Sequence, residues 1–265
     1  NKTEEKISFV IDKTAPEVDY EGLKKNVHYQ NPGELTIKAN EPGSLNVAAE
    51  RDGEPFFAGN TSNKKTLKNW EKDGDYTITT IATDLAGNTS EKTVFKFVKD
   101  STKPKLDISG VKEGAYYNKT QALQFTAMER YFKTNKVKVS ITKELKGKET
   151  EIPYEFASDS EKAMHSFTAK DEGKYNIKFT ATDEAGNEAT PQEISFTIDK
   201  TPPKTKMSNV KKNFHYKNAP KLHIEANEPG TVYAVIKRDG KKVKSIKGKN
   251  DIDTSAFGKD GEYVV

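Results

Sequence analysis

The sequence predicts an all-β protein built from β-sandwiches that follow one another along the chain. Residues 76–83 and 175–182 alternate apolar and polar side chains, a period typical of half-buried strands. Each stretch runs into an Asp-x-Ala-Gly-Asn turn, at Asp84–Asn88 and Asp183–Asn187, where Gly and Asn tolerate a positive φ. Strand and turn then recur with the blocks that flank them, which indicates tandem repeats.

Each strand of this kind begins with a tyrosine that follows an acidic-glycine corner. The three tyrosines are Tyr76, Tyr175 and Tyr263. A Tyr at this place is typical of the tyrosine corner of an immunoglobulin-like sandwich, where the hydroxyl bonds to nearby backbone. We therefore predict tandem immunoglobulin-like sandwiches, two complete and one truncated, in an elongated array.

The repeats also predict where the domains begin and end. Ile7–Pro16 recurs as Ile194–Pro203, and Asp199 follows Asp12 by 187 residues. A diverged middle repeat begins near Asp100, 88 residues after Asp12, and is 11 residues longer than the first. The predicted segments are 1–11, the last strand of a preceding repeat; 12–98, domain 1; 99–198, domain 2, with an insertion at about 131–162; and 199–265, an incomplete domain 3.

Within the first repeat, short apolar-polar runs alternate with Asn-Pro-Gly, Glu-Pro-Gly, Asp-Gly and Ala-Gly-Asn turns, which favours an antiparallel sandwich. We expect Ile78 to pack on Leu35 and Ile37, and Ile177 on Leu123 and Phe125, so that apolar burial replaces an intersheet disulfide. The expected strands are Glu17–Tyr20, Glu34–Ala39, Ser44–Arg51, Lys65–Lys68, Tyr76–Thr83 and Thr93–Val98.

Composition narrows the function classes. The 265 residues include no cysteine, which excludes disulfides and zinc-thiolate sites, and no run of 18 apolar residues that would insert into a membrane. The net charge is +4, but only Arg51, Arg130 and Arg238 among the 44 basic residues are arginines. Because lysines alternate with acids along the strands, we expect a solvated surface and no nucleic-acid partner.

The repeat motifs resemble those of bacterial Ig-like repeats in cell-surface proteins and adhesins, especially of Gram-positive bacteria. The matching residues are an Asp-Lys-Thr-x-Pro start, at Asp12–Pro16 and Asp199–Pro203, and the Thr-Asp-x-Ala-Gly-Asn turns at Thr83–Asn88 and Thr182–Asn187. The resemblance covers nearly the whole chain. It implies an extracellular location on the bacterial cell surface, cell-wall anchored or secreted, next to further repeats of the same chain.

Acidic side chains are predicted to converge at the domain junctions. In such a sandwich the chain start and two loops lie at one pole, and their carboxylates and carbonyls suit Ca²⁺, which takes six to eight oxygens. Alternatively, the Asp-x-Ala-Gly-Asn residues only close their own turns. In domain 2, we expect Arg130 to lie beside Asp183 and to disfavour a metal. The candidate ligands are Asp12, Asn40, Glu41, Asp84, Asn88, Asp100, Asp183, Asn187, Asp199 and Glu228.

Adjacent aromatic residues are the candidate binding surface for a host protein or a glycan. On a strand, one member of each pair must point away from the core and can anchor a partner. Both members can instead pack in loops or between domains. The candidates are Tyr116, Tyr117, Tyr131 and Phe132.

No nucleophile–base–orienter set is recognisable, so no catalytic residue is predicted. The favoured function is a non-catalytic extracellular stalk or adhesin region that spaces, and can present, binding surfaces. One alternative is a dedicated carbohydrate- or host-protein-binding module. Another is the accessory region of a secreted glycoside-active enzyme.

Overall fold

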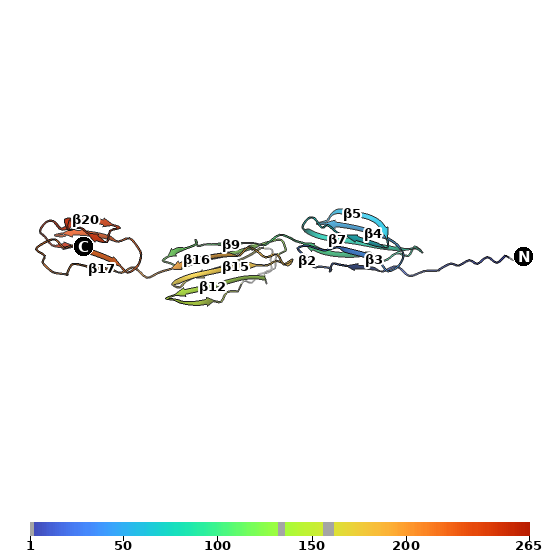
Figure 1. Ribbon diagram of the computed structural model, residues 1–265, viewed down its shortest axis with the longest axis horizontal. Helices are drawn as coiled ribbons and strands as arrows, with labels where there is room; N and C mark the ends of the chain where they lie inside the picture. The colour runs from blue at the N-terminus through green and yellow to red at the C-terminus, as the bar shows by residue number, and fades with distance from the viewer. Residues whose placement is uncertain (1–2, 132–135, 156–161) are drawn as a thin grey trace. The chain divides into compact units, whose positions relative to one another are not determined.

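The structure is a computed structural model that describes residues 3–131, 136–155 and 162–265. It divides into two compact units, Asn1–Asp199 and Lys200–Val265. The first unit holds two β-sandwiches, domain 1 (β1–β8) and domain 2 (β9–β16), and the second holds domain 3 (β17–β22) (Figure 1). Within the described ranges, no helix has the length and apolar character needed to cross a membrane.

Domain 1 packs a three-stranded sheet, in the order β1-β3-β6, on a five-stranded sheet, in the order β2-β8-β7-β4-β5. The pairs are antiparallel except β2–β8, which runs parallel. Buried residues alternate with residues that are mostly half-buried along β7, as the sequence pattern requires. The strands are β1 Val18–Glu21, β2 His28–Tyr29, β3 Leu35–Ala39, β4 Gly43–Arg51, β5 Glu54–Ser62, β6 Lys64–Leu67, β7 Gly74–Asp84 and β8 Thr93–Lys99.

The domain 1 core lies between its two sheets. Leu35 and Ile37 of β3 and Ile78 of β7 are fully buried in one cluster, as expected. Trp70 joins the cluster, and its ring nitrogen donates to Gly33 O at 2.7 Å. The Tyr76 hydroxyl donates to Lys72 O at 2.7 Å, which is the predicted tyrosine corner.

Domain 2 repeats this architecture with sheets β14-β11-β9 and β10-β16-β15-β12-β13. Leu123, Phe125 and Ile177 share its core, and Tyr175 OH donates to Asp171 O at 3.0 Å. β12 and β13 form a hairpin that lies within the predicted insertion at about 131–162 and occupies the place of β4–β5 in domain 1. The strands are β9 Lys105–Ser109, β10 Ala115–Tyr117, β11 Gln121–Met128, β12 Val137–Leu145, β13 Lys148–Ile152, β14 Lys162–Ala169, β15 Gly173–Ala181 and β16 Gln192–Ile198.

Domain 3 has sheets β17-β18-β21 and β20-β19-β22, and a 3-10 helix at Thr254–Phe257. Its corner tyrosine, Tyr263, donates to Lys259 O at 2.7 Å. The aromatic that aligns with Trp70, Phe257, packs against the core of this domain. The strands are β17 Thr205–Ser208, β18 Leu222–Ala226, β19 Tyr233–Arg238, β20 Lys241–Lys247, β21 Asp251–Ile252 and β22 Tyr263–Val264.

Two strands of domain 1 were not predicted. β2 has only two residues, too few to show a period, and β5 is mostly exposed, with Pro55 and Gly59 interrupting its pattern. β5 pairs with β4 alone, at the edge of the sheet, where such residues are tolerated. The six predicted strands of domain 1 are present, each displaced by no more than two residues at either end.

Candidate metal centre

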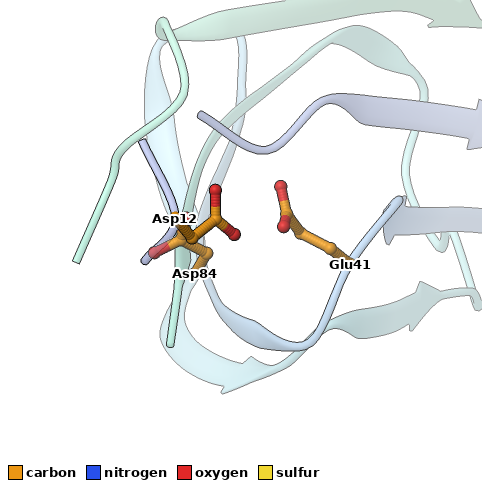
Figure 2. A group of neighbouring side chains, drawn as sticks. All are labelled: Asp12, Glu41 and Asp84. Carbon is orange, nitrogen blue, oxygen red and sulfur yellow. The ribbon is translucent and has the colours of Figure 1, made fainter. Parts of the chain in front are cut away.

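The first acidic cluster lies at the end of domain 1 where the chain enters. Asp12 precedes β1, Glu41 lies in the β3–β4 turn, and Asp84 ends β7. One carboxylate oxygen from each residue lies within 4.8 Å of the other two. Figure 2 shows Asp12 and Asp84 together, with Glu41 reaching toward them from the opposite loop.

The second cluster is built the same way at the junction of domains 1 and 2. Asp100 lies in the linker between β8 and β9, Glu129 follows β11, and Asp183 follows β15. Their carboxylate oxygens also lie within 4.8 Å of one another. Asp100 and Asp183 are fully buried here, whereas Asp12 is half-buried in the first cluster.

An asparagine fixes the aspartates in both clusters. Asn187 N and Nδ2 donate to the two carboxylate oxygens of Asp183, both at 2.8 Å, and Nδ2 also donates to Asp100 O at 2.9 Å. Asn88 makes the corresponding bonds to Asp84 and to Asp12 O. The turn-closing role considered above is therefore real, and it also holds the linker against the domain.

Burial and mutual repulsion perturb the second cluster. Burial raises the pKa of Asp100; a hydrogen bond from Thr102 N opposes the rise, and the charge of Asp183 adds to it. Burial likewise raises the pKa of Glu129, against a hydrogen bond from Tyr131 N. Asp100 Oδ2 is fully buried and has no hydrogen-bond partner among the described residues, a costly state for a carboxylate oxygen.

The first cluster is more solvated. Burial, followed by the charges of Asp12 and Asp84, raises the pKa of Glu41. Burial also acts to raise the pKa of Asp84, but hydrogen bonds from Asn88 and from backbone amides outweigh it, and the pKa is lowered. The ionised form of Asp84 is therefore already stabilised by the turn.

These donors fit a hard divalent cation. Two oxygens bound to one Ca²⁺ lie at most about 5 Å apart, and carboxylates are the ligands that Ca²⁺ prefers. Asp100 Oδ2 supplies an oxygen to which no described residue donates a hydrogen bond. Two basic side chains lie near these acids. Lys136 Nζ donates to Asp183 O at 2.9 Å, and the charge of His28, in domain 1, acts to lower the pKa of Asp100.

The remaining predicted ligands have other surroundings. Asn40 Oδ1 accepts from Glu17 N at 2.9 Å, which closes the start of β1. Asp199 ends the first unit, and its backbone N donates to Tyr117 O. Glu228 belongs to the second unit, where its Oε1 is buried and accepts no hydrogen bond from the residues that the structure describes.

Arg130 corrects one expectation. Its guanidinium does not neutralise the second cluster; it bonds Asp52 and Asp75 of domain 1, at 2.9 and 2.8 Å. Glu129, which was not predicted as a ligand, takes its place beside Asp183. The signal was present in the sequence, because the offset of 88 that relates Asp12 to Asp100 also relates Glu41 to Glu129.

The predicted binding aromatics lie in different settings. Tyr116 is 79% exposed, whereas Tyr117 packs on the core edge-on to Phe196. Tyr131 is half-buried; its hydroxyl donates to Asp75 at 3.2 Å and its ring lies edge-on to His28. Phe132 lies outside the described residues.

The linker between domains 1 and 2 is also held from the domain 1 side. Asp73, in the corner before Tyr76, accepts hydrogen bonds from Lys99 Nζ at 2.6 Å and from Ser101 N at 2.9 Å. Burial would raise the pKa of Asp73, but these bonds and one from Thr102 outweigh it and lower the pKa to about 2. Bonds from both domains thus fix residues 99–102.

The sequence of domain 2 is similar to one known protein family. Residues 103–200, which span β9–β16, match the family model of the bacterial Ig-like domain. Domain 2 is therefore similar to the bacterial Ig-like domain over its full length. Domain 1 shares the strand order of both sheets of this Ig-like domain. No curated protein has a sequence that matches the chain.

Three solved structures align with this chain at low sequence identity and low TM-score. The fibronectin(III)-like modules of Clostridium thermocellum CbhA are 18% identical, cover 69% of this chain and 94% of theirs, and have a TM-score of 0.30. The titin I9–I11 tandem is 13% identical, with 91% and 92% covered and a TM-score of 0.23. The chicken CNTN1 FN1–FN3 domains are 15% identical, with 70% and 67% covered and a TM-score of 0.24.

Proposed function

We propose that the chain is a non-catalytic spacer region of an extracellular bacterial surface protein, with joints that a divalent cation, Ca²⁺, stiffens. Ig-like domains are typically non-catalytic, and tandem sandwiches space whatever lies beyond them. A spacer needs joints that keep successive domains in a row.

The joint between domains 1 and 2 supports this proposal. Domain 1 holds the linker through Asp73, and domain 2 holds it through Asn187. A free linker of this length would let its two domains reorient, because interdomain motion is the default where the interface is small. The adhesive alternative has less support, because Tyr117 and Tyr131 are already engaged within the chain.

The observation that carries the cation is Asp100 Oδ2. It is buried without a hydrogen-bond partner among the described residues, and its carboxyl group belongs to the cluster formed with Glu129 and Asp183. A Ca²⁺ ion would ligate the Asp100, Glu129 and Asp183 oxygens, remove their mutual repulsion and join a linker residue to two loops of domain 2. The more solvated cluster at Asp12, Glu41 and Asp84 would bind more weakly, since its carboxylates gain less from neutralisation.

The test is calorimetric titration of the full chain with CaCl₂ at pH 7, after chelator treatment. We expect binding that Glu129→Gln weakens at least tenfold. The matched control is Glu151→Gln, which changes an exposed acid on β13 and should leave binding unchanged. Absence of heat and of any Ca²⁺-induced rise in melting temperature in the unmodified chain would overturn the cation part of the proposal.

A further inference from the structure

A corner of domain 1 serves as a receptor for a loop of domain 2. Asp52 occupies the β4–β5 turn with φ 51°, and its Oδ1 accepts from Asp75 N at 3.0 Å. Asp52 N donates in turn to Asp75 O at 2.8 Å. These two bonds place both carboxylates on one surface.

The loop that docks there is Glu129-Arg130-Tyr131. One guanidinium nitrogen of Arg130 bonds both acids, while Tyr131 donates to Asp75 and stacks under the Arg130 guanidinium at 4.9 Å. The resulting interface combines charge with ring packing. Exposed ion pairs contribute little energy, so its main effect is to select a partner and an orientation.

Domain 3 carries the same corner. Asp239 has φ 50°, its Oδ1 accepts from Glu262 N at 2.8 Å, and its N donates to Glu262 O at 2.8 Å. An arginine flanks the aspartate in both corners, since Arg51 Nε lies 3.9 Å from Asp52 and Arg238 Nε 3.7 Å from Asp239.

The two corners differ in how much of the aspartate is covered. The Asp52 side chain is 35% exposed under Arg130, whereas the Asp239 side chain is 60% exposed. Glu262 is exposed as well. The domain 3 corner thus has the same backbone geometry and the same negative charges as the domain 1 corner. Among the described residues, no arginine loop covers it.

Domain 2 has the opposite arrangement. Lys174 stands where domain 1 has Asp75, and the β12–β13 turn carries Lys146 in place of an aspartate. Only domain 2 carries the Arg-Tyr loop, because the corresponding loops of domains 1 and 3 read Glu-Pro-Gly. The chain therefore contains two kinds of domain, one with an acidic corner and one with an arginine loop.

We propose that the Asp239–Glu262 corner of domain 3 is a docking site for the Glu-Arg-Tyr loop of a following domain of the domain 2 kind. The structural repeat would then be a pair of domains, 187 residues long. The contact between acidic corner and arginine loop would make the two kinds of domain alternate along the chain. This inference does not depend on the cation.

The test extends the full chain after Val265 with a second copy of residues 79–199, which continues the 187-residue period. Spin labels on cysteines placed in domain 3 and in the appended domain report their separation. We expect one narrow distance distribution in the parent, and a distribution at least twice as broad after Glu262→Lys. Changing the appended arginine to Glu in the Glu262→Lys background should restore the narrow distribution.

Glu262 is the residue to vary, because its carboxylate makes none of the described bonds within its own domain and its loss should not unfold the corner. The matched control is Glu225→Gln, an exposed acid on β18. Asp75→Lys should broaden the domain 1–domain 2 distance and leave the appended joint narrow. A parent distribution that is already broad, or one that Glu262→Lys leaves unchanged, would overturn the proposal.

Discussion

Asp73 and Asp100 lie next to the same linker but respond to it in opposite ways. Asp73 receives hydrogen bonds from Lys99, Ser101 and Thr102, which lower its pKa to about 2. Asp100 is buried beside other acids, and its pKa is raised. Ionisation therefore stabilises the fold at Asp73 and destabilises it at Asp100.

We expect Asp73→Asn to reduce the stability of domain 1 by roughly 2 kcal/mol at pH 7. Because the pKa is lower in the folded state, this contribution is full above about pH 4 and is lost as the pH falls toward about 2. Urea unfolding followed by fluorescence of Trp70, the only tryptophan, measures it. A variant that differs from the parent as much at pH 2 as at pH 7 would contradict this account.

At Asp100 the sign is reversed. A carboxyl whose pKa is raised on folding destabilises the folded state when ionised, and the penalty disappears as the pH falls below its unfolded pKa. Asp100→Asn should therefore stabilise the chelator-treated chain at pH 7 and abolish Ca²⁺ binding at the second cluster.

In the parent, Ca²⁺ at about 100 times its Kd should stabilise the fold by about 2.7 kcal/mol at pH 7, and much less near pH 4, where protons compete. Thermal melts at both pH values measure this. If Ca²⁺ raised the stability of the parent and of Asp100→Asn equally, the ion would bind at another site.

At the scale of elements, the tyrosine corner recurs in all three domains. Tyr76, Tyr175 and Tyr263 each donate to the carbonyl four residues earlier. The ring of Tyr76 also stacks on Phe97 of β8, at 5.0 Å between centroids. The corner thus joins the turn before β7 to the core.

We expect Tyr76→Phe to cost about 1 kcal/mol of domain 1 stability, because it removes one partly buried hydrogen bond and keeps the ring. Trp70 fluorescence again reports the unfolding. Tyr116→Phe is the control, since that hydroxyl lies on an exposed side chain. Equal effects of the two substitutions would show that the corner bond contributes nothing.

The strands with one buried face could be predicted from the two-residue period of their apolar side chains and from the turn residues that follow them. β3, β4 and β7 alternate clearly, and Gly87-Asn88 marks the turn that ends β7. β2 and β5 were not predicted, because pairing with neighbouring strands, and not a pattern in their own side chains, holds them in the sheet.

The first acidic cluster was predictable because loops of a repeated sandwich meet at one pole. The position of Arg130 was not, because its partners Asp52 and Asp75 lie in another domain, 78 and 55 residues away in sequence. Sequence comparison within one repeat cannot show a contact between two repeats. The offset of 88 could have identified Glu129, since it needs only the alignment of Glu41.

At the scale of the whole molecule, the linker bonds and the Arg130 contact predict restricted motion between domains 1 and 2. The chain has no cysteine, so cysteines introduced at Lys92 and Glu149, both exposed, would carry spin labels uniquely. We expect Ca²⁺ to narrow the distance distribution between them, and Glu129→Gln to prevent the narrowing. If Ca²⁺ still narrowed the distance distribution in Glu129→Gln, the stiffness of the joint would not depend on this cluster.

The parallel pairing of β2 with β8 has a mechanical consequence. β2 lies near the start of domain 1 and β8 at its end, and Val98 N–Val27 O, Asp100 N–Tyr29 O and Asn26 N–Lys96 O join the two segments. Tension between the ends of the domain pulls parallel neighbours in opposite directions along their length. The three hydrogen bonds are then loaded in shear at the same time and do not break one after another. β2, the shortest strand of the domain, therefore helps the domain to resist extension.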